Sequence, residues 1–264
     1  MKQQKVVFIV IAYRPLMRDL KPLLEALKNL PVIVVDNGKT LEKSHVGKAT
    51  LLTQRSNHGY AGAANRGIHY ASAHGATWFV VVNQDFHLDR SDALHLVRTL
   101  SNISPCVAGP FPGGLDLKRW TTMLPSTRFD YLTGSCLAIH EKVIRKVGYF
   151  YEPYFLYYED TDYCMRAKQK GFNLVRLELG HAKHKESKTL GPGSFLHQYY
   201  LSRNHYLFVE RLAPFRVKMY EVARFPKTLF EHITRHETGA LLGIVDYMIR
   251  KFGITKRRIH DGRH

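Results

Sequence analysis

Residues 6–38 read VVFIVIAYRPLMRDLKPLLEALKNLPVIVVDNG, and this stretch decides the fold class. The apolar, β-branched run at 6–11 predicts a buried strand. Leucines then recur three or four positions apart across residues 17–29, which predicts a helix. A second apolar run at 32–35 predicts another strand, and a polar turn at 36–38 follows it. Strand, helix and strand in this order are typical of a mainly parallel α/β sheet covered by helices.

The same alternation continues beyond this unit. Further strands are predicted at 50–54, 77–82, 131–139 and 172–177, and further helices at 63–73, 141–146 and 160–170. Residues 105–127 contain four prolines and three glycines, which predicts an irregular lid over the site. After Ser194 the pattern is helical, with 13 Lys and Arg against 6 Asp and Glu from residue 203 onward. We therefore expect a catalytic domain at 1–195 and a basic helical extension at 196–264.

The composition is that of a folded protein. Of the 264 residues, 45% are hydrophobic and 23% charged, which excludes a mainly disordered chain. The formal net charge of +17 favours an anionic partner, whether nucleic acid, nucleotide phosphates or an acidic membrane. Cys106, Cys136 and Cys164 do not fit a disulfide framework or a zinc knuckle, so buried thiols and a reducing, cytoplasmic setting are expected. No apolar stretch approaches the roughly 20 residues of a spanning helix.

The tripeptide Asn83-Gln84-Asp85 stands where an apolar strand is predicted to end. In open α/β sheets, ligands bind at the carboxyl ends of the strands. A carboxylate held there suits a hard divalent cation, Mg²⁺ or Mn²⁺, which would take its other oxygen ligands from substrate phosphates and water. The alternative interpretation is an Asx-turn that ends the strand.

Residues 158–162 read YEDTD and place three carboxylates at the start of a predicted helix. Capping and the helix dipole explain one of them. Three exceed what one cap requires in so basic a chain, and a carboxylate at a cleft edge can accept a proton from a hydroxyl nucleophile. We expect Asp160 to be this general base. The aromatic run at 149–158 is interpreted as packing, with stacking on a sugar ring as the alternative.

Several ordered motifs resemble the family 2 glycosyltransferases, in particular the bacterial rhamnosyltransferase-like branch. The matching segments lie within about residues 6–210 and are Val6–Tyr13, Val34–Asn37, Asn57–Gly67, Asn83–Asp85, Gly134–Ser135, Glu159–Arg166 and Arg203–Asn204. The resemblance implies a GT-A fold, a Rossmann-like mainly parallel sheet, with a nucleoside-diphosphate sugar donor of the dTDP or UDP type. It also implies a divalent metal and inversion at the anomeric carbon. The chain departs from the family pattern at Ala12, Arg14, Asn83 and Gln84.

The resemblance further implies roles for individual residues. Asp160 matches the catalytic base and Asp85 the metal-binding carboxylate, and His184 is favoured over His181 as a late metal or diphosphate contact. The donor pocket would include Ala12, Tyr13, Arg14, Asp36, Asn57, Gly59, Asn65, Gly67, Asn83 and Gln84. The acceptor side would include Trp120, Gly134, Ser135, Glu159 and Asp162. Turn formation and helix packing are the alternative roles of the glycines.

The C-terminal segment at 230–252 mixes apolar residues with flanking Arg and Lys, which is typical of a helix on an anionic membrane surface. A helix packed on the catalytic domain, with a solvated basic tail, is the alternative.

The expected function is metal-dependent, inverting transfer of a sugar, with rhamnose among the candidates. The acceptor would be a glycan or lipid-linked glycan of bacterial surface polysaccharide synthesis, in the cytoplasm or at the inner face of the cell membrane. Two rivals stay open. A sugar nucleotidyltransferase shares an α/β nucleotide site, whereas a basic nucleic-acid-binding protein would leave the acidic motifs unexplained, so nucleic acid is not the expected partner.

Overall fold

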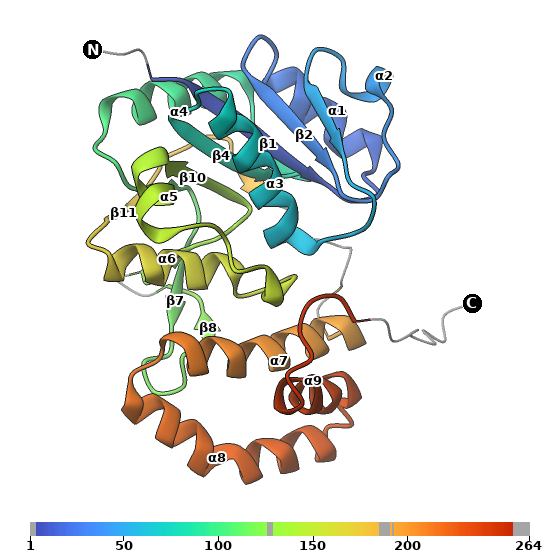
Figure 1. Ribbon diagram of the computed structural model, residues 1–264, viewed down its shortest axis with the longest axis vertical. Helices are drawn as coiled ribbons and strands as arrows, with labels where there is room; N and C mark the ends of the chain where they lie inside the picture. Colours follow the sequence, from blue (N-terminus) through green and yellow to red (C-terminus); the bar gives the residue numbers. More distant parts are fainter. Residues whose placement is uncertain (1–3, 126–128, 185–190, 192, 256–264) are drawn as a thin grey trace.

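The computed structural model of the protein describes residues 4–125, 129–184, 191 and 193–255, and within these residues seven strands form a central sheet (Figure 1). From one edge to the other they are β11 (Leu174–Arg176), β6 (Val107–Gly109), β10 (Cys136–His140), β4 (Trp78–Asn83), β1 (Val6–Ala12), β2 (Val32–Asp36) and β3 (Thr50–Thr53). Neighbouring strands are parallel except at β10, which is antiparallel to β4 and to β6. The mainly parallel α/β sheet expected from the sequence is confirmed.

Helices cover both faces of this sheet. They are α1 (Met17–Ala26), α2 (Lys43–Val46), α3 (Gly59–Ala73), α4 (Arg90–Asn102), α5 (Glu141–Val147), the 3-10 helix η1 (Glu152–Tyr154) and α6 (Glu159–Gln169). Side chains alternate between the two faces along β1, so that Ile9 packs in one core with α3, α5 and α6, whereas Phe8 packs in another with α1 and α4. Burial on both faces explains why the parallel strands read as continuous apolar runs.

The segment at 105–127 contains regular structure. Its first part forms β6 in the central sheet, and β7 (Pro112–Leu115) pairs with β8 (Thr122–Met123) and with β9 (Tyr131–Leu132). The expectation of an irregular lid was wrong for these strands, because such short strands are defined by their pairing partners and carry no sequence periodicity. The single strand expected at 131–139 is divided into β9 and β10. Residues 126–128 lie outside the described part of the chain.

The described part of the C-terminal extension consists of α7 (Phe195–Leu212), α8 (Phe215–Thr234) and α9 (Thr238–Met248), which lie below the sheet in Figure 1. Helix α9 packs closely on α7, since a Cβ at Gly239 or Gly243 would lie 2.3 Å from a backbone oxygen of α7. A single helix at 230–252 was a wrong expectation, because the chain turns at 235–237 between α8 and α9. Residues 256–264 of the basic tail lie outside the described residues.

The cysteine and membrane-span expectations can also be compared with the fold. Cys106, Cys136 and Cys164 are free and buried, as the sequence predicts. Among the described helices, none combines the length and the apolarity that crossing a bilayer requires.

Candidate functional site

A small cavity of about 150 Å³ opens at the carboxyl ends of β1, β2 and β3. It is lined by Tyr13, Arg14, Asn37, Gly38, Lys39, Gln54, Arg55, Ser56 and Asn57. Loops from parallel strands converge at this edge of a sheet, which brings together residues far apart in the chain. Of the residues predicted for the donor pocket, Tyr13, Arg14 and Asn57 line the cavity. The cations Arg14, Lys39 and Arg55 in its lining suit an anionic ligand such as a nucleotide phosphate.

Asn37 organises one wall of this cavity, although no separate role was predicted for it from the sequence. Its amide nitrogen donates to Asn57 Oδ1 at 2.8 Å and to the Gly59 carbonyl oxygen at 3.0 Å. Its Oδ1 accepts from the backbone amide of His58 at 2.9 Å. Asn37 therefore fixes the loop between β3 and α3. The available signal was its place directly after β2, beside the aspartate that was singled out.

Asp36 and Ala12 form the last residue pair of β2 and β1. Asp36 is fully buried, with Oδ1 accepting from the Gly38 amide at 3.1 Å. Its Oδ2 accepts from the amides of Thr40 and Leu41, each at 2.8 Å. These bonds hold the turn after β2, so the donor-pocket role expected for Asp36 stays a prediction.

Gln84 ties the end of β4 to the end of β1. Its Oε1 accepts from the Tyr13 amide at 2.7 Å, and its Nε2 donates to the Tyr13 carbonyl oxygen at 3.3 Å. The two bonds satisfy both backbone groups of the residue that follows β1. Gln84, one of the positions at which the chain departs from the pattern of the resembling family, thus fixes two neighbouring strand ends of the candidate site.

Asp85 lies half-buried between β4 and the short strand β5 (Phe86–His87). Strand β5 pairs antiparallel with β12 (Lys183–His184), and the register sets His184 opposite Phe86. The backbone of His184 is therefore next to the residue that follows Asp85. This juxtaposition joins two segments that are far apart in the sequence and that were both predicted to contact a metal.

Gly134 and Ser135 join the end of β4 to the predicted base. The Asn83 amide donates to the Ser135 carbonyl oxygen at 3.0 Å. The Gly134 amide donates to Asp160 Oδ2 at 2.7 Å. A Cβ at residue 134 would lie 3.4 Å from Asp160 Cβ, so the backbone approaches α6 closely here. One turn therefore contacts both the strand that leads to Asp85 and the carboxylate of Asp160.

Asp160 is the second residue of α6 and is half-buried. Its Oδ1 accepts from the Thr161 amide at 2.6 Å, while Oδ2 accepts from Gly134. Burial raises the pKa of the Asp160 carboxyl above its ordinary value, although the Gly134 and Thr161 amides partly oppose the shift. A carboxylate with a raised pKa is a stronger base, which suits a residue that removes a proton from a hydroxyl group.

Glu159 precedes this residue and is buried, and among the described residues its Oε2 has no hydrogen-bond partner. Burial, followed by the negative charge of Asp160, raises the pKa of Glu159 well above its ordinary value. The folded protein therefore holds a proton at Glu159 at pH values where the unfolded chain has already lost it. The free energy of unfolding consequently falls as the pH rises from the ordinary glutamate pKa through the raised one.

We expect Glu159→Gln to raise the melting temperature at pH 8 but not at pH 4. Glutamine has no titrating proton, so the variant escapes this destabilisation, with about 2–4 °C gained for each kcal/mol recovered. At pH 4, close to the ordinary pKa of a glutamate, wild type and variant should unfold together. Thermal unfolding followed by circular dichroism measures both, and an equal gain at the two pH values would contradict the proton linkage.

The loop before α6 has a constrained backbone, and α7 holds it. Phe155, Tyr157 and Tyr158 have φ angles of 66°, 67° and 71°, in the left-handed region that such residues rarely adopt. Asn204 Nδ2 donates to three carbonyl oxygens of this loop at 2.7 to 3.0 Å. The buried guanidinium of Arg203 donates to two carbonyl oxygens at its start. These two residues, the last motif of the resemblance, therefore position the segment that leads into Asp160.

Asp162 and Trp120, both predicted on the acceptor side, face the C-terminal helices. Asp162 is fully buried, with Oδ1 at 2.5 Å from Arg166 Nε and Oδ2 at 3.2 Å from Arg211 Nε. Trp120 is buried, and its ring centroid lies 5.4 Å from that of Phe208 in α7. Asp162 thus ties α6 to α7. An acceptor contact by Asp162 or Trp120 stays a prediction that these contacts do not support.

Gly59, Asn65 and Gly67 lie on α3, where the structure shows them in packing contacts. Gly59 has a φ of 72°, and a Cβ there would lie 2.1 Å from a carbonyl oxygen of the loop before α6. A Cβ at Gly67 would lie 2.2 Å from Ile9 Cγ2. Asn65 bonds the backbone N–H and C=O of Phe150, each at 2.9 Å. Turn formation and helix packing therefore account for these residues, and their donor contacts stay predictions.

Near the start of α4, the described residues bring together three possible metal ligands, Asp89, Asp92 and His181, with ligand atoms within 4.8 Å of one another. The group contains neither Asp85 nor His184. Asp89 caps α4 by accepting from the Asp92 amide at 2.7 Å, and its Oδ2 lies 2.8 Å from His181 Nδ1. Asp92 accepts from two consecutive backbone amides, that of His181 included, at 2.8 to 3.0 Å. These bonds clamp the segment before β12 to α4.

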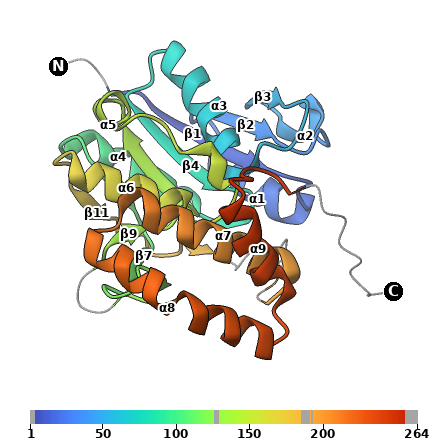
Figure 2. The same ribbon diagram turned by 60° about the horizontal axis from the view of Figure 1, so that its bottom comes forward.

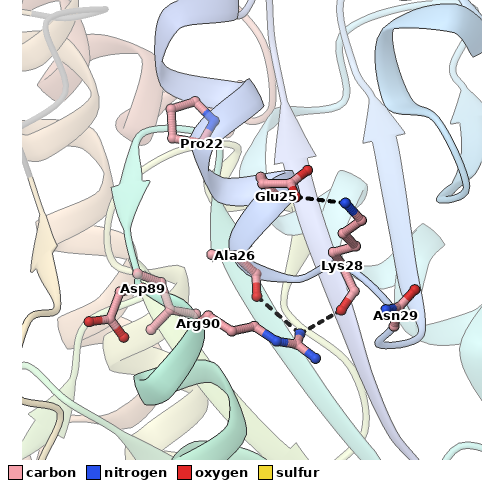
Figure 3. Close-up of a pocket in the computed structure, with 8 residues that line it drawn as sticks. Pro22, Glu25, Ala26, Lys28, Asn29, Asp89 and Arg90 are labelled. Carbon is pink, nitrogen blue, oxygen red and sulfur yellow. Dashed lines mark hydrogen bonds and ion pairs between the residues drawn. The ribbon is translucent and has the colours of Figure 1, made fainter.

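A shallow groove of about 530 Å³ lies between α1 and the start of α4 (Figure 3). Arg90 extends along it and donates to the carbonyl oxygens of Ala26 and Lys28, where α1 ends. Lys28 also pairs with Glu25 at 2.9 Å. The charges of Arg90, Lys28 and Glu25 are therefore used within the groove and at the end of α1, and we assign no ligand to it.

Comparison with known proteins places these features in context. No protein-family model matches the chain. The low-salt glycan biosynthesis hexosyltransferase Agl10 of Haloferax volcanii is 28% identical over 228 residues, which cover 75% of this chain and 73% of Agl10. The dTDP-rhamnosyl transferase RfbF of Shigella flexneri is 26% identical over 235 residues, covering 77% of this chain and 79% of RfbF.

Solved structures show the same fold. S. aureus TarS 1–349 in complex with UDP-GlcNAc matches with a TM-score of 0.59 and 12% identity, covering 93% of this chain and 81% of that one. GalNAc-T7 with UDP, GalNAc and Mn²⁺ matches with a TM-score of 0.53 and 11% identity, covering 90% and 58%. The expected GT-A fold and the resemblance to rhamnosyltransferase-like enzymes of family 2 are confirmed.

Proposed function

Because the chain is a glycosyltransferase with the GT-A fold, we propose that it transfers a sugar from a nucleoside diphosphate to a hydroxyl group, with inversion at the anomeric carbon. The donor is of the dTDP or UDP type. Rhamnose is the first sugar to test, since one relative is named a dTDP-rhamnosyl transferase. The acceptor is a glycan or lipid-linked glycan, and the enzyme acts in the cytoplasm at the inner face of the cell membrane.

The observation that carries this proposal is the turn at Gly134 and Ser135. It contacts the end of β4 through the Asn83 amide at 3.0 Å and the Asp160 carboxylate at 2.7 Å. The cavity lies at the ends of β1, β2 and β3, and β4 is the direct neighbour of β1 in the sheet. A nucleotide in this cavity would extend its diphosphate along the sheet edge toward Asp85 and its sugar toward Asp160.

The residues at this edge fit a divalent cation. Asp85 offers a half-buried carboxylate, and the backbone register sets His184 opposite Phe86. The Asp85 carboxylate supplies one ligand and leaves room for phosphate oxygens and water, the ligands that Mg²⁺ and Mn²⁺ take at nucleotides. Asp85 and His184 would hold the ion, whose contribution is to neutralise negative charge on the diphosphate. His181 is the weaker candidate because it pairs with Asp89.

The chain's own residues would supply the remaining chemistry. Asp160 takes the proton of the acceptor hydroxyl as that oxygen forms a bond to the anomeric carbon. The bond from this carbon to the diphosphate oxygen breaks on the opposite face, so the nucleoside diphosphate leaves with its electron pair. General-base catalysis of this kind contributes about 10²–10⁴-fold to the rate. Arg203 and Asn204 hold the loop before Asp160 and so keep the base in place.

A transfer assay that separates the products tests the proposal. The purified protein is incubated with Mg²⁺ or Mn²⁺, a lipid-linked glycan acceptor, and dTDP-, UDP- and GDP-sugars in turn. We expect one nucleoside diphosphate to form for each glycosylated acceptor. Release of pyrophosphate would support the nucleotidyltransferase alternative. Absence of transfer together with steep, salt-dependent binding of DNA or RNA would support the nucleic-acid-binding alternative.

Asp85→Ala is expected to remove the metal-dependent part of donor binding. A ligand that binds only the folded protein at a hundredfold excess over its Kd should raise the melting temperature by about 5 °C or more. The variant should lose most of this rise when donor and Mn²⁺ are added together. Asp89→Asn is the matched control, because asparagine still caps α4. A loss in this control alone would instead locate the metal at Asp89, Asp92 and His181.

A further inference from the structure

Helix α8 exposes an apolar stripe along its whole length. The stripe consists of six exposed residues spaced three or four positions apart: Phe215, Met219, Val222, Pro226, Phe230 and Ile233. At 3.6 residues per turn, these positions fall within about 80° of one another around the helix axis. Phe215 is 77% exposed and Phe230 is 67% exposed. A continuous apolar surface of this kind on a folded protein marks a contact with another molecule or with a membrane.

The opposite face of α8 packs on the rest of the protein. Val217, Glu221 and Thr228 on this face are buried. Glu221 Oε1 lies 2.9 Å from Arg119 Nε in the β7–β8 hairpin, and Oε2 lies 3.3 Å from His205 Nε2 in α7. These contacts fix the helix with its stripe outward. In Figures 1 and 2, α8 lies at the end of the molecule away from the sheet.

Positive charge borders this stripe. Lys218 lies on one side of the stripe, and Arg216 and Lys227 lie on the other. Arg235 follows the C-terminal end of the helix. The two acids of α8 lie on its other side, where Glu221 is buried and Glu231 pairs with Arg224 at 2.9 Å. The outward surface of α8 is therefore an apolar stripe bordered by cations.

We infer that α8 docks on an anionic lipid bilayer, with the stripe at the boundary between headgroups and acyl chains and the flanking cations at lipid phosphates. An amphipathic helix of this composition lies in the plane of the interface. A second copy of the chain is the other possible occupant. Pairing two such stripes would bring like charges together, in a chain whose net charge is already +17. Charge complementarity therefore selects the bilayer.

This docking surface is connected through Arg119 to the β7–β8 hairpin, which carries Trp120. Arg119, which binds Glu221, precedes Trp120, and Trp120 packs against Phe208 of α7. The hairpin that carries these residues pairs with β9, which leads into residues 133–135. A bilayer bound by α8 would therefore lie on the same side of the protein as this hairpin. That the acceptor is lipid-linked rests on the proposed function, whereas the docking does not.

Vesicle flotation of the full chain tests the inference. Vesicles of phosphatidylcholine with phosphatidylglycerol should carry the wild type upward, and vesicles of phosphatidylcholine alone should not. The triple variant Phe215→Ser, Phe230→Ser and Ile233→Ser keeps every charge, and we expect its partition coefficient to fall about a hundredfold. Neutralising Arg216 and Lys227 to glutamine should lower it about fivefold for each charge.

Matched controls lie on α4, which carries the exposed residues Leu94 and Arg98. Leu94→Ser and Arg98→Gln should float like the wild type. If the triple variant floats like the wild type, the inference is overturned. It is also overturned if the wild type is a dimer and the triple variant is a monomer with unchanged flotation. If the triple variant fails to fold, the Arg216 and Lys227 variants still decide the outcome.

The same experiment separates docking from catalysis. Flotation requires neither donor nor acceptor, so a chain that floats through α8 but transfers no sugar refutes the proposed function alone. Conversely, an active enzyme whose flotation ignores the stripe refutes the docking alone. With a water-soluble acceptor analogue, the triple variant should transfer sugar at the wild-type rate, because α8 does not contact the candidate site.

Discussion

We expect Asp160→Asn to lower kcat by about 10²–10⁴-fold and to leave donor binding close to that of the wild type. Asparagine occupies the same space but cannot take the proton of the acceptor hydroxyl. The cavity proposed for the donor is built from the loops after β1, β2 and β3, so the substitution does not touch it. Initial rates of transfer, with donor affinity measured by calorimetry on the same preparations, give the two quantities separately.

The pH dependence of the rate gives a second measure of this residue. Burial raises the pKa of the Asp160 carboxyl. As the pH is lowered, kcat/KM of the wild type should therefore begin to fall at a pH above the ordinary aspartate pKa of about 3.9. The residual activity of Asp160→Asn should lack this acidic limb. Asp160→Glu keeps a carboxylate one methylene further out and should retain intermediate activity. A near-wild-type rate in Asp160→Asn would remove the residue from the role of base.

Asp162 lies only two residues from Asp160, but its role is structural. Asp162→Asn should destabilise the fold by about 3–5 kcal/mol. Asp162 is fully buried between the guanidinium groups of Arg166 and Arg211, and the Tyr154 hydroxyl donates to it at 3.1 Å. Removing its charge leaves two largely buried cations without their counter-ion. We expect the melting temperature to drop by about 10 °C or more.

Glu178→Gln is the matched control for this change. Glu178 pairs with Arg176 at 3.1 Å, but its side chain is 79% exposed, so solvent screens the pair and its loss should cost less than about 1 kcal/mol. Differential scanning calorimetry of both variants gives the comparison. A melting temperature of Asp162→Asn within 2 °C of the wild type would show that the buried ion pairs do not hold α6 to α7.

Much of the sheet could be predicted from local sequence. Prediction from local sequence placed the strands β1, β2 and β4 to within a few residues, because strands covered on both faces need apolar side chains at every position. The helices α1 and α5 were also placed to within a few residues. Strands β6, β7 and β8 were missed because they are two to four residues long and lie in a segment rich in proline and glycine. Only their partners define strands of this length.

The candidate site was predictable in part for a similar reason. Asp85, Asp160 and the residues after β1 stand at ends of predicted elements, where the chain itself indicates a functional position. The wall that Asn37 forms with Asn57, and the link that Gly134 makes to Asp160, depend on neighbours brought from distant segments. The sequence likewise could not show that the carboxylate of Asp162 is used by two arginines of the fold.

By itself, then, the sequence determined the alternating strands and helices, the fold class and the acidic positions at the strand and helix ends, because these follow from local periodicity and residue chemistry. Tertiary structure alone decided which face of α8 is buried. An apolar stripe normally predicts the buried face of a helix. Here Glu221 finds Arg119 and His205 on neighbouring elements, so the polar side turns inward and the apolar side turns to the surface.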